Sequence, residues 1–329
     1  MAEAIHILYC TDPGYMLPTL VSAASAITHA REHPVVIHLV ESGVSDAAWL
    51  DFSTRLKSLR EDAEVVRHAW NDARFDNCPA WHGSRIIYAR LVIQDMLPDV
   101  DWAISVDGDT LWLGDPWEML NLRDETKLYQ ISADPPDPNG QENPVFEWYA
   151  KRGLKMDQKD YLCVGAMLMN LEKLRECDFT KQALDFLGKY PDPKYPEQMV
   201  MCYLAQGKVS PLPTQWGVYS FYHNTVDMLK PCLVHYVQDG PWQRRKIVNL
   251  MSDIALVWHD FARTVLGVDT AARVPLCSRI WRRMVFLILK KNQWLLRFNR
   301  RLAGYFRNTR GLSREEMKTL HNRFVSFAK

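Results

Sequence analysis

The segment Ile104–Asp115 reads ISVDGDTLWLGD and carries the pattern from which the rest of the fold can be built. With the preceding alanine, its first residues form a short apolar run, Ala103–Val106, of the kind that makes a buried strand. Asp107 stands at the end of this predicted strand, and Asp109 follows two residues later. In open α/β sheets, ligands bind beyond the carboxyl ends of the strands, so both carboxylates are expected at a binding edge.

Strands and helices alternate before this segment. Short β-prone runs and stretches of helical periodicity predict elements at His6–Cys10, Leu17–Thr28, Val35–Val40, Ser45–Leu59 and Glu64–His68. A further helix is expected from Ser84, which can cap its N-terminus, to about Met96. This alternation is typical of an α/β fold with a parallel, doubly wound sheet.

Strands and helices are also predicted after the acidic segment. They are expected at Cys163–Asn170, Leu171–Lys189, Glu197–Ala205, Lys208–Leu212 and Cys232–Tyr236. There is no internal repeat and no low-complexity linker. We therefore predict one α/β domain over residues 1–250, followed by a helical region over residues 251–329.

Composition narrows the class of protein. Of the 329 residues, 47% are apolar, enough for a sizeable core. The seven cysteines are scattered without C-x-x-C spacing, which argues against a disulfide framework and a structural zinc site. The N-terminus lacks the pattern of a signal peptide, and no run reaches the roughly 18 apolar residues of a membrane span. A cytoplasmic protein is expected.

Charge is distributed unevenly between the two predicted regions. From residue 270 onward there are 15 Lys and Arg against two acids, a net charge of +13, whereas the remainder has 25 against 37, a net charge of −12. Apolar residues recur at helical spacing from Ser278 to Arg307, with basic residues beside them. Such basic amphipathic helices lie in the interface of anionic membranes, which predicts peripheral association with the cytoplasmic face of a membrane.

An alternative for the same region is a pair of helices that pack on the acidic surface of the first domain. Nucleic acid is not an expected partner, because the rest of the chain is acidic and shows no recognition motif.

The pair of acids at the strand end has a defined chemistry. Two hard oxygen ligands, Asp107 and Asp109, can hold Mn²⁺ or Mg²⁺ and leave positions open for a diphosphate. The intervening Gly108 lets the backbone turn and a ligand approach closely. A D-x-D sequence alone is more typical of a polar turn after a strand, and it is the position of the two acids directly after AISV that favours a binding site.

Two other functions for the acids fit less well. A haloacid-dehalogenase phosphatase needs Thr or Val where this chain has Leu111, and its motif usually opens the domain. A dinucleotide-binding domain needs G-x-G-x-x-G after the first strand, and that motif is missing from this sequence.

Six segments together resemble the retaining glycosyltransferases of family 8, the group that contains lipopolysaccharide galactosyltransferases and glycogenin. They occur in matching order and spacing over about residues 5–245. The segments are ILYCTDPGY (Ile7–Tyr15), YARL (Tyr88–Leu91), ISVDGDTLWLGD (Ile104–Asp115), VGAMLMNL (Val164–Leu171), YPEQ (Tyr195–Gln198) and HYVQDGPW (His235–Trp242). The resemblance implies a GT-A-like fold, a Rossmann-type mixed sheet flanked by helices, with a UDP-sugar as donor.

The resemblance also implies roles at the donor end of the site. Thr11, Asp12 and Tyr15 would contact the uridine, with the Tyr15 ring stacked on the base. Arg90 would orient the diphosphate or the sugar through its planar fork of donors. Gly108 and Trp242 would complete the donor site.

The implied metal ligands are Asp107, Asp109 and His235. Asp134 matches a position that grips sugar hydroxyls, and Gln198 matches the residue below the anomeric carbon.

The implied activity is that of a metal-dependent hexosyltransferase. It would transfer galactose or glucose from a UDP-sugar to a glycan or lipid-linked glycan with retention, as in lipopolysaccharide or surface polysaccharide synthesis. Cys163, Met199 and Gly240 stand where the family commonly has Asn, an acid and Lys. These departures leave open a non-catalytic sugar-nucleotide-binding or membrane-scaffold protein of the same fold.

Overall fold

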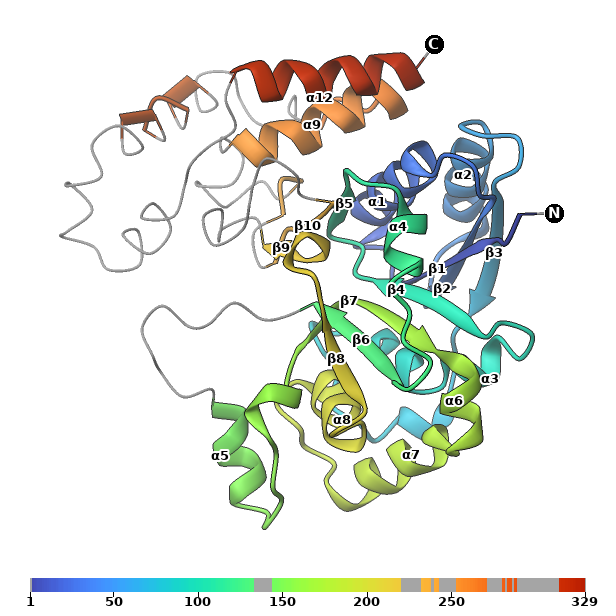
Figure 1. The fold of residues 1–329 in the computed structure, drawn as a ribbon, viewed down its shortest axis with the longest axis vertical. Helices are drawn as coiled ribbons and strands as arrows, with labels where there is room; N and C mark the ends of the chain where they lie inside the picture. Colours follow the sequence, from blue (N-terminus) through green and yellow to red (C-terminus); the bar gives the residue numbers. More distant parts are fainter. Residues whose placement is uncertain are drawn as a thin grey trace.

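The fold is that of a computed structural model, shown in Figure 1. It describes residues 2–132, 144–219, 232–237, 240–242, 253–270, 280–281, 283–285, 287–288 and 314–328.

A mixed sheet of seven strands forms the centre of the molecule, in the order β3-β2-β1-β4-β7-β6-β8. Its strands are β1 (Ile5–Thr11), β2 (Val35–Glu41), β3 (Glu64–Ala69), β4 (Trp102–Val106), β6 (Tyr129–Ser132), β7 (Cys163–Asn170) and β8 (Val209–Leu212). The first four strands are parallel, while β7 runs antiparallel to both β4 and β6. The Rossmann-type mixed sheet that the resemblance implies is confirmed, whereas the parallel sheet expected from the alternation of elements is interrupted by the antiparallel β7.

The sheet is buried on both faces. Along β1, Ile5, Ile7 and Tyr9 enter one core while Leu8 enters the other, as the two-residue period of a strand requires. The first core is shared with α1 (Met16–His29) and α2 (Asp46–Lys57). The second lies under α3 (Ile93–Met96), α6 (Leu171–Glu176), α7 (Phe179–Lys189) and α8 (Pro196–Leu204). The remaining short helices are α4 (Pro116–Leu120), α5 (Pro144–Ala150), η1 (Ala73–Phe75), η3 (Gln158–Asp160) and η4 (Thr214–Trp216).

Two predicted helices differ from the structure. The segment Ser84–Met96 is not one helix but a 3-10 helix, η2 (Ile86–Leu91), followed by the single turn of α3. The backbone of Val92, with φ −129° and ψ 9°, is not helical and separates the two elements. The β-branched Ile86 and Ile93, which begin η2 and α3, also have a lower helix propensity than unbranched residues. The segment Leu171–Lys189 is divided between α6 and α7 by Asp178, which adopts the left-handed conformation.

A second sheet, of three strands, begins within the acidic segment. Its order is β5-β10-β9, formed by β5 (Thr110–Trp112), β10 (Leu233–His235) and β9 (Val218–Tyr219). Strand β10 pairs antiparallel with β5, and His235 is directly opposite Thr110. The chain after β4 is thereby joined to a strand more than 120 residues later.

The described helices of the C-terminal region pack on the first domain. In Figure 1, α9 (Asp253–Leu266) and α12 (Arg314–Phe327) lie side by side next to α1. Phe324 is fully buried in the same core as α1, with its ring 5.2 Å from that of Phe261. Arg323 donates a hydrogen bond to the carbonyl of Leu113 over 2.8 Å. Helix α12 thus packs on the first domain through an apolar contact. The predicted packing of helices on an acidic surface and the domain boundary at residue 250 stay predictions.

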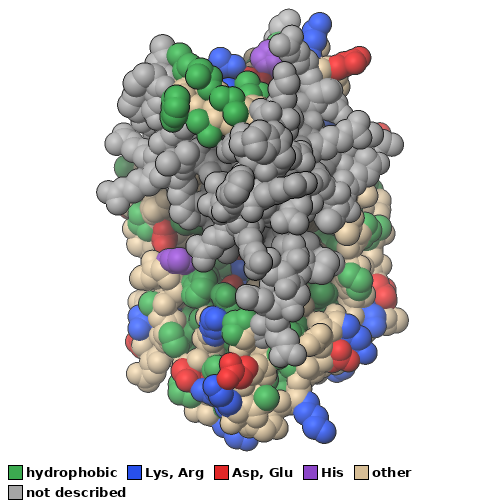
Figure 2. All heavy atoms as spheres, turned by 90° about the vertical axis from the view of Figure 1, so that its left-hand side faces the viewer, with side chains coloured by type: hydrophobic (Ala, Val, Ile, Leu, Met, Phe, Trp, Pro, Cys, Tyr) green, Lys and Arg blue, Asp and Glu red, His purple; other side chains and the backbone are tan. Residues whose placement is uncertain are grey.

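The predicted amphipathic stretch 278–307 lies mostly outside the described residues. Among its described positions, five large apolar side chains are 45–64% exposed, namely Ile280, Trp281, Met284, Leu287 and Ile288. Figure 2 shows hydrophobic side chains gathered near the top of the face that it draws. Within the part of the chain that the structure describes, no helix is both long and apolar enough to span a bilayer.

Three histidines form a hydrogen-bonded row across the first three strands. His6 Nδ1 lies 2.9 Å from His38 Nε2, and His38 Nδ1 lies 3.1 Å from His68 Nε2. Burial, together with the two neighbouring imidazoles, lowers the pKa of His38 to about 3. Burial also lowers the pKa of His6, against the opposing charges of Glu64 and Glu3, and that of His68.

This row should make stability depend on pH. Since the folded-state pKa of His38 lies below its unfolded value of about 6.5, the unfolded chain binds more protons as the pH falls. The free energy of unfolding should fall by about 1 to 2 kcal/mol between pH 6.5 and pH 5 from this residue alone. In His38→Gln that contribution should be missing from urea unfolding curves recorded across the range. An equally steep pH dependence in the variant would contradict this assignment.

Candidate metal centre and donor site

The acidic turn at the end of β4 is fixed from both sides. The backbone N–H of Asp107 donates to the carbonyl of Gly165 in β7 over 2.9 Å. The N–H of Tyr236, just after β10, donates to the carbonyl of Asp109 over 2.8 Å. Because β10 also pairs with β5, His235 is held against the turn that carries both acids.

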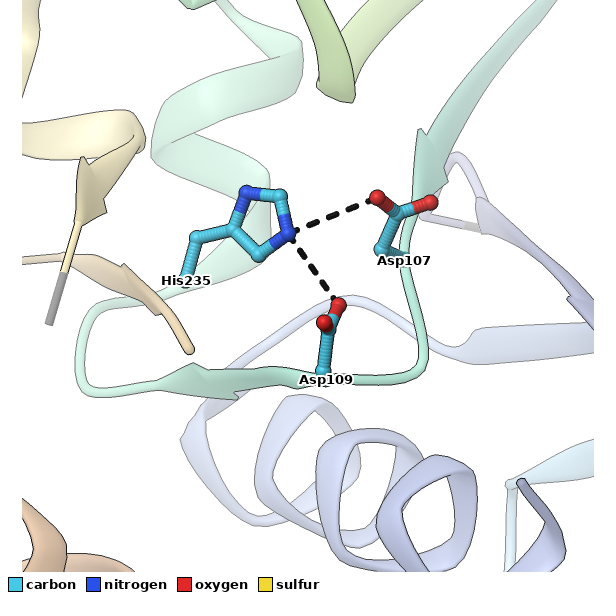
Figure 3. Close-up of side chains that lie close together, drawn as sticks. All are labelled: Asp107, Asp109 and His235. Carbon is cyan, nitrogen blue, oxygen red and sulfur yellow. Dashed lines mark hydrogen bonds and ion pairs between the residues drawn. The ribbon is translucent and has the colours of Figure 1, made fainter. Parts of the chain in front are cut away.

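The three predicted metal ligands lie together (Figure 3). His235 Nε2 is 3.1 Å from Asp109 Oδ1 and 3.4 Å from Asp107 Oδ2. One ligand atom from each residue lies within 4.8 Å of the other two. The His235 side chain is buried at 4% exposure, whereas that of Asp107 remains 32% exposed and faces an accessible side.

The surroundings fit a divalent ion. Two carboxylate oxygens and one imidazole nitrogen form a donor set suited to Mn²⁺ and related ions, and they leave further positions open. Gly165 makes room for this set, because a Cβ atom there would lie 2.2 Å from His235 Cε1 and 2.9 Å from Asp107 Oδ2. The missing side chain at Gly165 is therefore a requirement of the site.

The charges of the site are strongly coupled. Burial would lower the pKa of His235, but Asp109 and Asp107 hold it well above its usual value. Burial would likewise raise the pKa of Asp107, but Arg90 and His235 hold it well below its usual range. The two carboxylates thus create a negative field at His235 that would equally attract a divalent cation.

Arg90 is buried within this cluster at 3% exposure. Its guanidinium donates to Asp107 and, over 3.4 Å, to Glu197 Oε1. Burial raises the pKa of Glu197, and the positive charge of Arg90 offsets part of this rise. Arg90 therefore connects a metal ligand to the helix of Gln198, and its contact with a donor stays a prediction.

Glu197 was not among the predicted site residues. Its neighbour Gln198 is predicted from the same YPEQ segment, but nothing in that segment signals that Glu197 contacts Arg90. Gln198 lies in the first turn of α8 and is half-buried. Asp134, the predicted sugar-gripping acid, lies outside the described residues.

Tyr15 and Trp242 meet at the edge of the metal centre. Their rings make an edge contact, with centroids 6.1 Å apart, and Trp242 packs in turn on Trp258 at 5.4 Å. Burial raises the pKa of Tyr15, and the negative charges of Asp109 and Asp107 raise it further. Tyr15 is still 39% exposed, so its ring remains accessible for stacking.

Thr11 and Asp12 shape the loop after β1. The Thr11 side chain is buried, with its hydroxyl 3.1 Å from that of Thr19, while Asp12 Oδ1 accepts from the backbone N–H of Gly14 over 2.9 Å. A hollow of about 500 Å³ opens beside this loop. Its lining includes Asp12, Gly14, Ser42, Trp70, Asn71 and Arg85.

The three departures from the family pattern have structural consequences. Met199 is fully buried among the apolar side chains of the second core. A Cβ atom at Gly240 would lie 2.3 Å from the ring of Trp242, which folds over that glycine. Cys163 is half-buried at the start of β7, and its side chain helps to raise the pKa of His235.

A family model described as Glycosyl transferase family 8 matches residues 6–246. None of the curated proteins matches the chain in sequence.

Similar solved structures include the galactosyltransferase LgtC in complex with donor and acceptor sugar analogs. It has a TM-score of 0.61 and 20% identity, covering 73% of this chain and 90% of that one. The apo form of the glycosyltransferase GlyE of Streptococcus pneumoniae TIGR4 has a TM-score of 0.58 and 15% identity over 82% of this chain and 62% of that one. Mouse xyloside xylosyltransferase 1 has a TM-score of 0.54 and 14% identity over 73% of this chain and 99% of that one. At these identities the likeness establishes a common GT-A fold.

Proposed function

This chain belongs to glycosyl transferase family 8, and from that membership we propose that it transfers a hexose from a UDP-sugar to a glycan or lipid-linked glycan. The observation that carries the proposal is the convergence of Asp107, Asp109 and His235 at the carboxyl end of β4. In this fold, that edge of the sheet is where a nucleotide ligand binds.

The three residues would hold Mn²⁺ or Mg²⁺, which when bound neutralises the charge of a departing diphosphate. Arg90 keeps Asp107 ionised and oriented, so that the ligand set is formed before the donor arrives. The rings of Tyr15 and Trp242 would provide a surface on which the nucleotide base can stack. The hollow beside Asp12 would accommodate the rest of the donor.

Retention is proposed for the stereochemistry. Gln198 carries an amide, which is a weak nucleophile, so departure and attack on the same face of the sugar fit this chain better than a covalent intermediate on Gln198. Galactose and glucose are the proposed sugars, and lipopolysaccharide or another surface polysaccharide is the proposed product.

A non-catalytic role is the competing proposal, and the geometry favours it less. Met199 and Gly240 are accommodated by the core and by Trp242, so neither departure removes a ligand of the metal. A panel of UDP-hexoses incubated with Mn²⁺, with EDTA as the control, separates the two. Metal-dependent UDP release from at least one donor is expected, and tight UDP binding without release from any donor would favour the non-catalytic role.

We also propose that the enzyme associates peripherally with the cytoplasmic face of a membrane. The exposed apolar set at residues 280–288 supports this, together with the net charge of +13 from residue 270 onward. Insertion of apolar side chains between the lipid headgroups and attraction of the cations to anionic lipids both contribute to the free energy of membrane binding. Deleting the whole region would be a poor test, because Phe324 of α12 belongs to the core.

Point substitutions test the membrane proposal. Trp281→Ser combined with Ile288→Ser should weaken co-sedimentation with anionic vesicles about tenfold or more, since full burial of each side chain is worth about 1.5 to 3 kcal/mol. Leu50→Ser is the matched control, because Leu50 is 64% exposed on α2 and should not contribute. Wild-type protein that stays in the supernatant, or binding that both variants retain, would refute the assignment.

A further inference from the structure

Helix α1 carries three hydroxyl side chains, Thr19, Ser22 and Ser25, that are completely buried. Elsewhere on its buried surface the same helix uses alanine, as at Ala23 and Ala26. A buried hydroxyl is costly unless it is hydrogen-bonded, so each of the three must have a partner. All three lie against the chain that runs from the acidic turn into β5.

Each hydroxyl is matched to a different point of that chain. Gly108 sits directly on Thr19, because a Cβ atom at Gly108 would lie 2.3 Å from Thr19 Oγ1. Ser22 Oγ lies 2.6 Å from Thr110 Oγ1. The backbone N–H of Trp112 donates to Ser25 Oγ over 2.9 Å. The glycine between the acids therefore serves a close approach to α1.

The hydrogen bonds around Ser22 form a chain in which each donor and acceptor can be assigned. Thr110 donates its only hydroxyl proton to the carbonyl of Asp107 over 2.8 Å, so Ser22 must donate to Thr110. The Ser22 proton is then used, so Tyr9, 3.0 Å away, must donate to Ser22. The indole N–H of Trp112 donates to the Tyr9 oxygen over 3.3 Å. Each bond polarises the next, and the last one ends on the peptide of a metal ligand.

We propose that Ser22 and Thr110 are positioning residues of the metal centre. Through the Asp107 carbonyl they fix the peptide that joins Asp107 to Gly108, and with it the separation of the two ligand carboxylates. The inference rests on the proposed function, since it assumes that this centre binds a divalent ion. It assigns no contact with substrate to either residue.

Direct binding of Mn²⁺ tests the proposal. In Thr110→Val and in Ser22→Ala the dissociation constant for Mn²⁺, measured by calorimetry on the full chain, should rise about fivefold or more, as expected for loss of a buried hydrogen bond. Thr28→Val is the matched control, because Thr28 is buried on the same helix and donates only to the carbonyl of Ser25 over 3.2 Å. It should lose comparable thermal stability and keep its Mn²⁺ affinity.

The outcomes distinguish the two proposals. If wild-type protein binds no Mn²⁺, the metal centre itself is refuted. If wild type binds but both variants bind equally well, only the positioning role is refuted. Should Thr110→Val fail to fold, Ser22→Ala decides, because it leaves Thr110 in place and removes the hydroxyl that donates to it; an unchanged Mn²⁺ affinity in that variant would overturn the inference.

Discussion

Replacing Asp109 by asparagine should reduce metal-dependent UDP release at least about 100-fold, because a lost metal ligand removes several kcal/mol of transition-state stabilisation. The protein should remain folded. Asp109 lies in a turn rather than in a core, and an asparagine oxygen can still accept from His235, now 3.1 Å from Asp109 Oδ1. UDP release with saturating Mn²⁺, together with circular dichroism of the variant, measures both parts.

Asp99 supplies the control for this substitution. It is an exposed acid shortly before the amino end of the same strand, β4, and Asp99→Asn should retain wild-type turnover. If Asp109→Asn kept more than about a tenth of the wild-type rate, the assignment of this carboxylate to the metal would have to be given up.

The second large effect is expected on stability, from Arg90→Met. The substitution leaves Asp107 and Glu197 without the cation that lies between them in a buried site. Breaking a buried ion pair by removing one partner typically costs about 3 to 5 kcal/mol, so urea unfolding should show a loss of that order.

Two further variants interpret that result. Arg90→Lys keeps the charge but not the planar fork, and should recover only part of the loss. Arg55→Met removes a surface cation that pairs with Asp51 on α2 and also donates to the carbonyl of Leu266, and it should cost no more than about 1 to 2 kcal/mol. Equal losses for Arg90→Met and Arg55→Met would show that the buried cluster contributes nothing particular.

Much of the fold could be predicted from sequence because its strands are short apolar runs between clear turn signals. Val35–Glu41 and Trp102–Val106 are strands because they are buried on both faces, and the position of Asp107 at a strand end follows from that. The subdivision of Ser84–Met96 could not be predicted, since it depends on the backbone of a single residue, Val92.

The assembly of the site required the structure. His235 reaches the acids only because β10 pairs with β5, a contact between segments far apart in the sequence. The roles of Gly165 and Glu197 arise from their neighbours in space, and no local pattern signals them. The resemblance supplied the ligand residues, whereas the buried hydroxyls of α1 had no counterpart in any motif.

The packing of the C-terminal region could not be predicted from the sequence either. Charge and periodicity identified a basic helical appendage, but the burial of Phe324 and the hydrogen bond from Arg323 to Leu113 depend on tertiary packing. Its last helix therefore belongs to the core of the protein, while the proposed membrane association rests on the exposed apolar set at residues 280–288.

Calorimetric titration of Mn²⁺, with UDP present, into wild-type protein and into His235→Ala tests the metal centre itself. We expect one ion per chain in wild type and an affinity at least about tenfold weaker in the variant, because one of three protein ligands is lost. Equal Mn²⁺ affinity in the two proteins would contradict the central claim that Asp107, Asp109 and His235 together hold the metal.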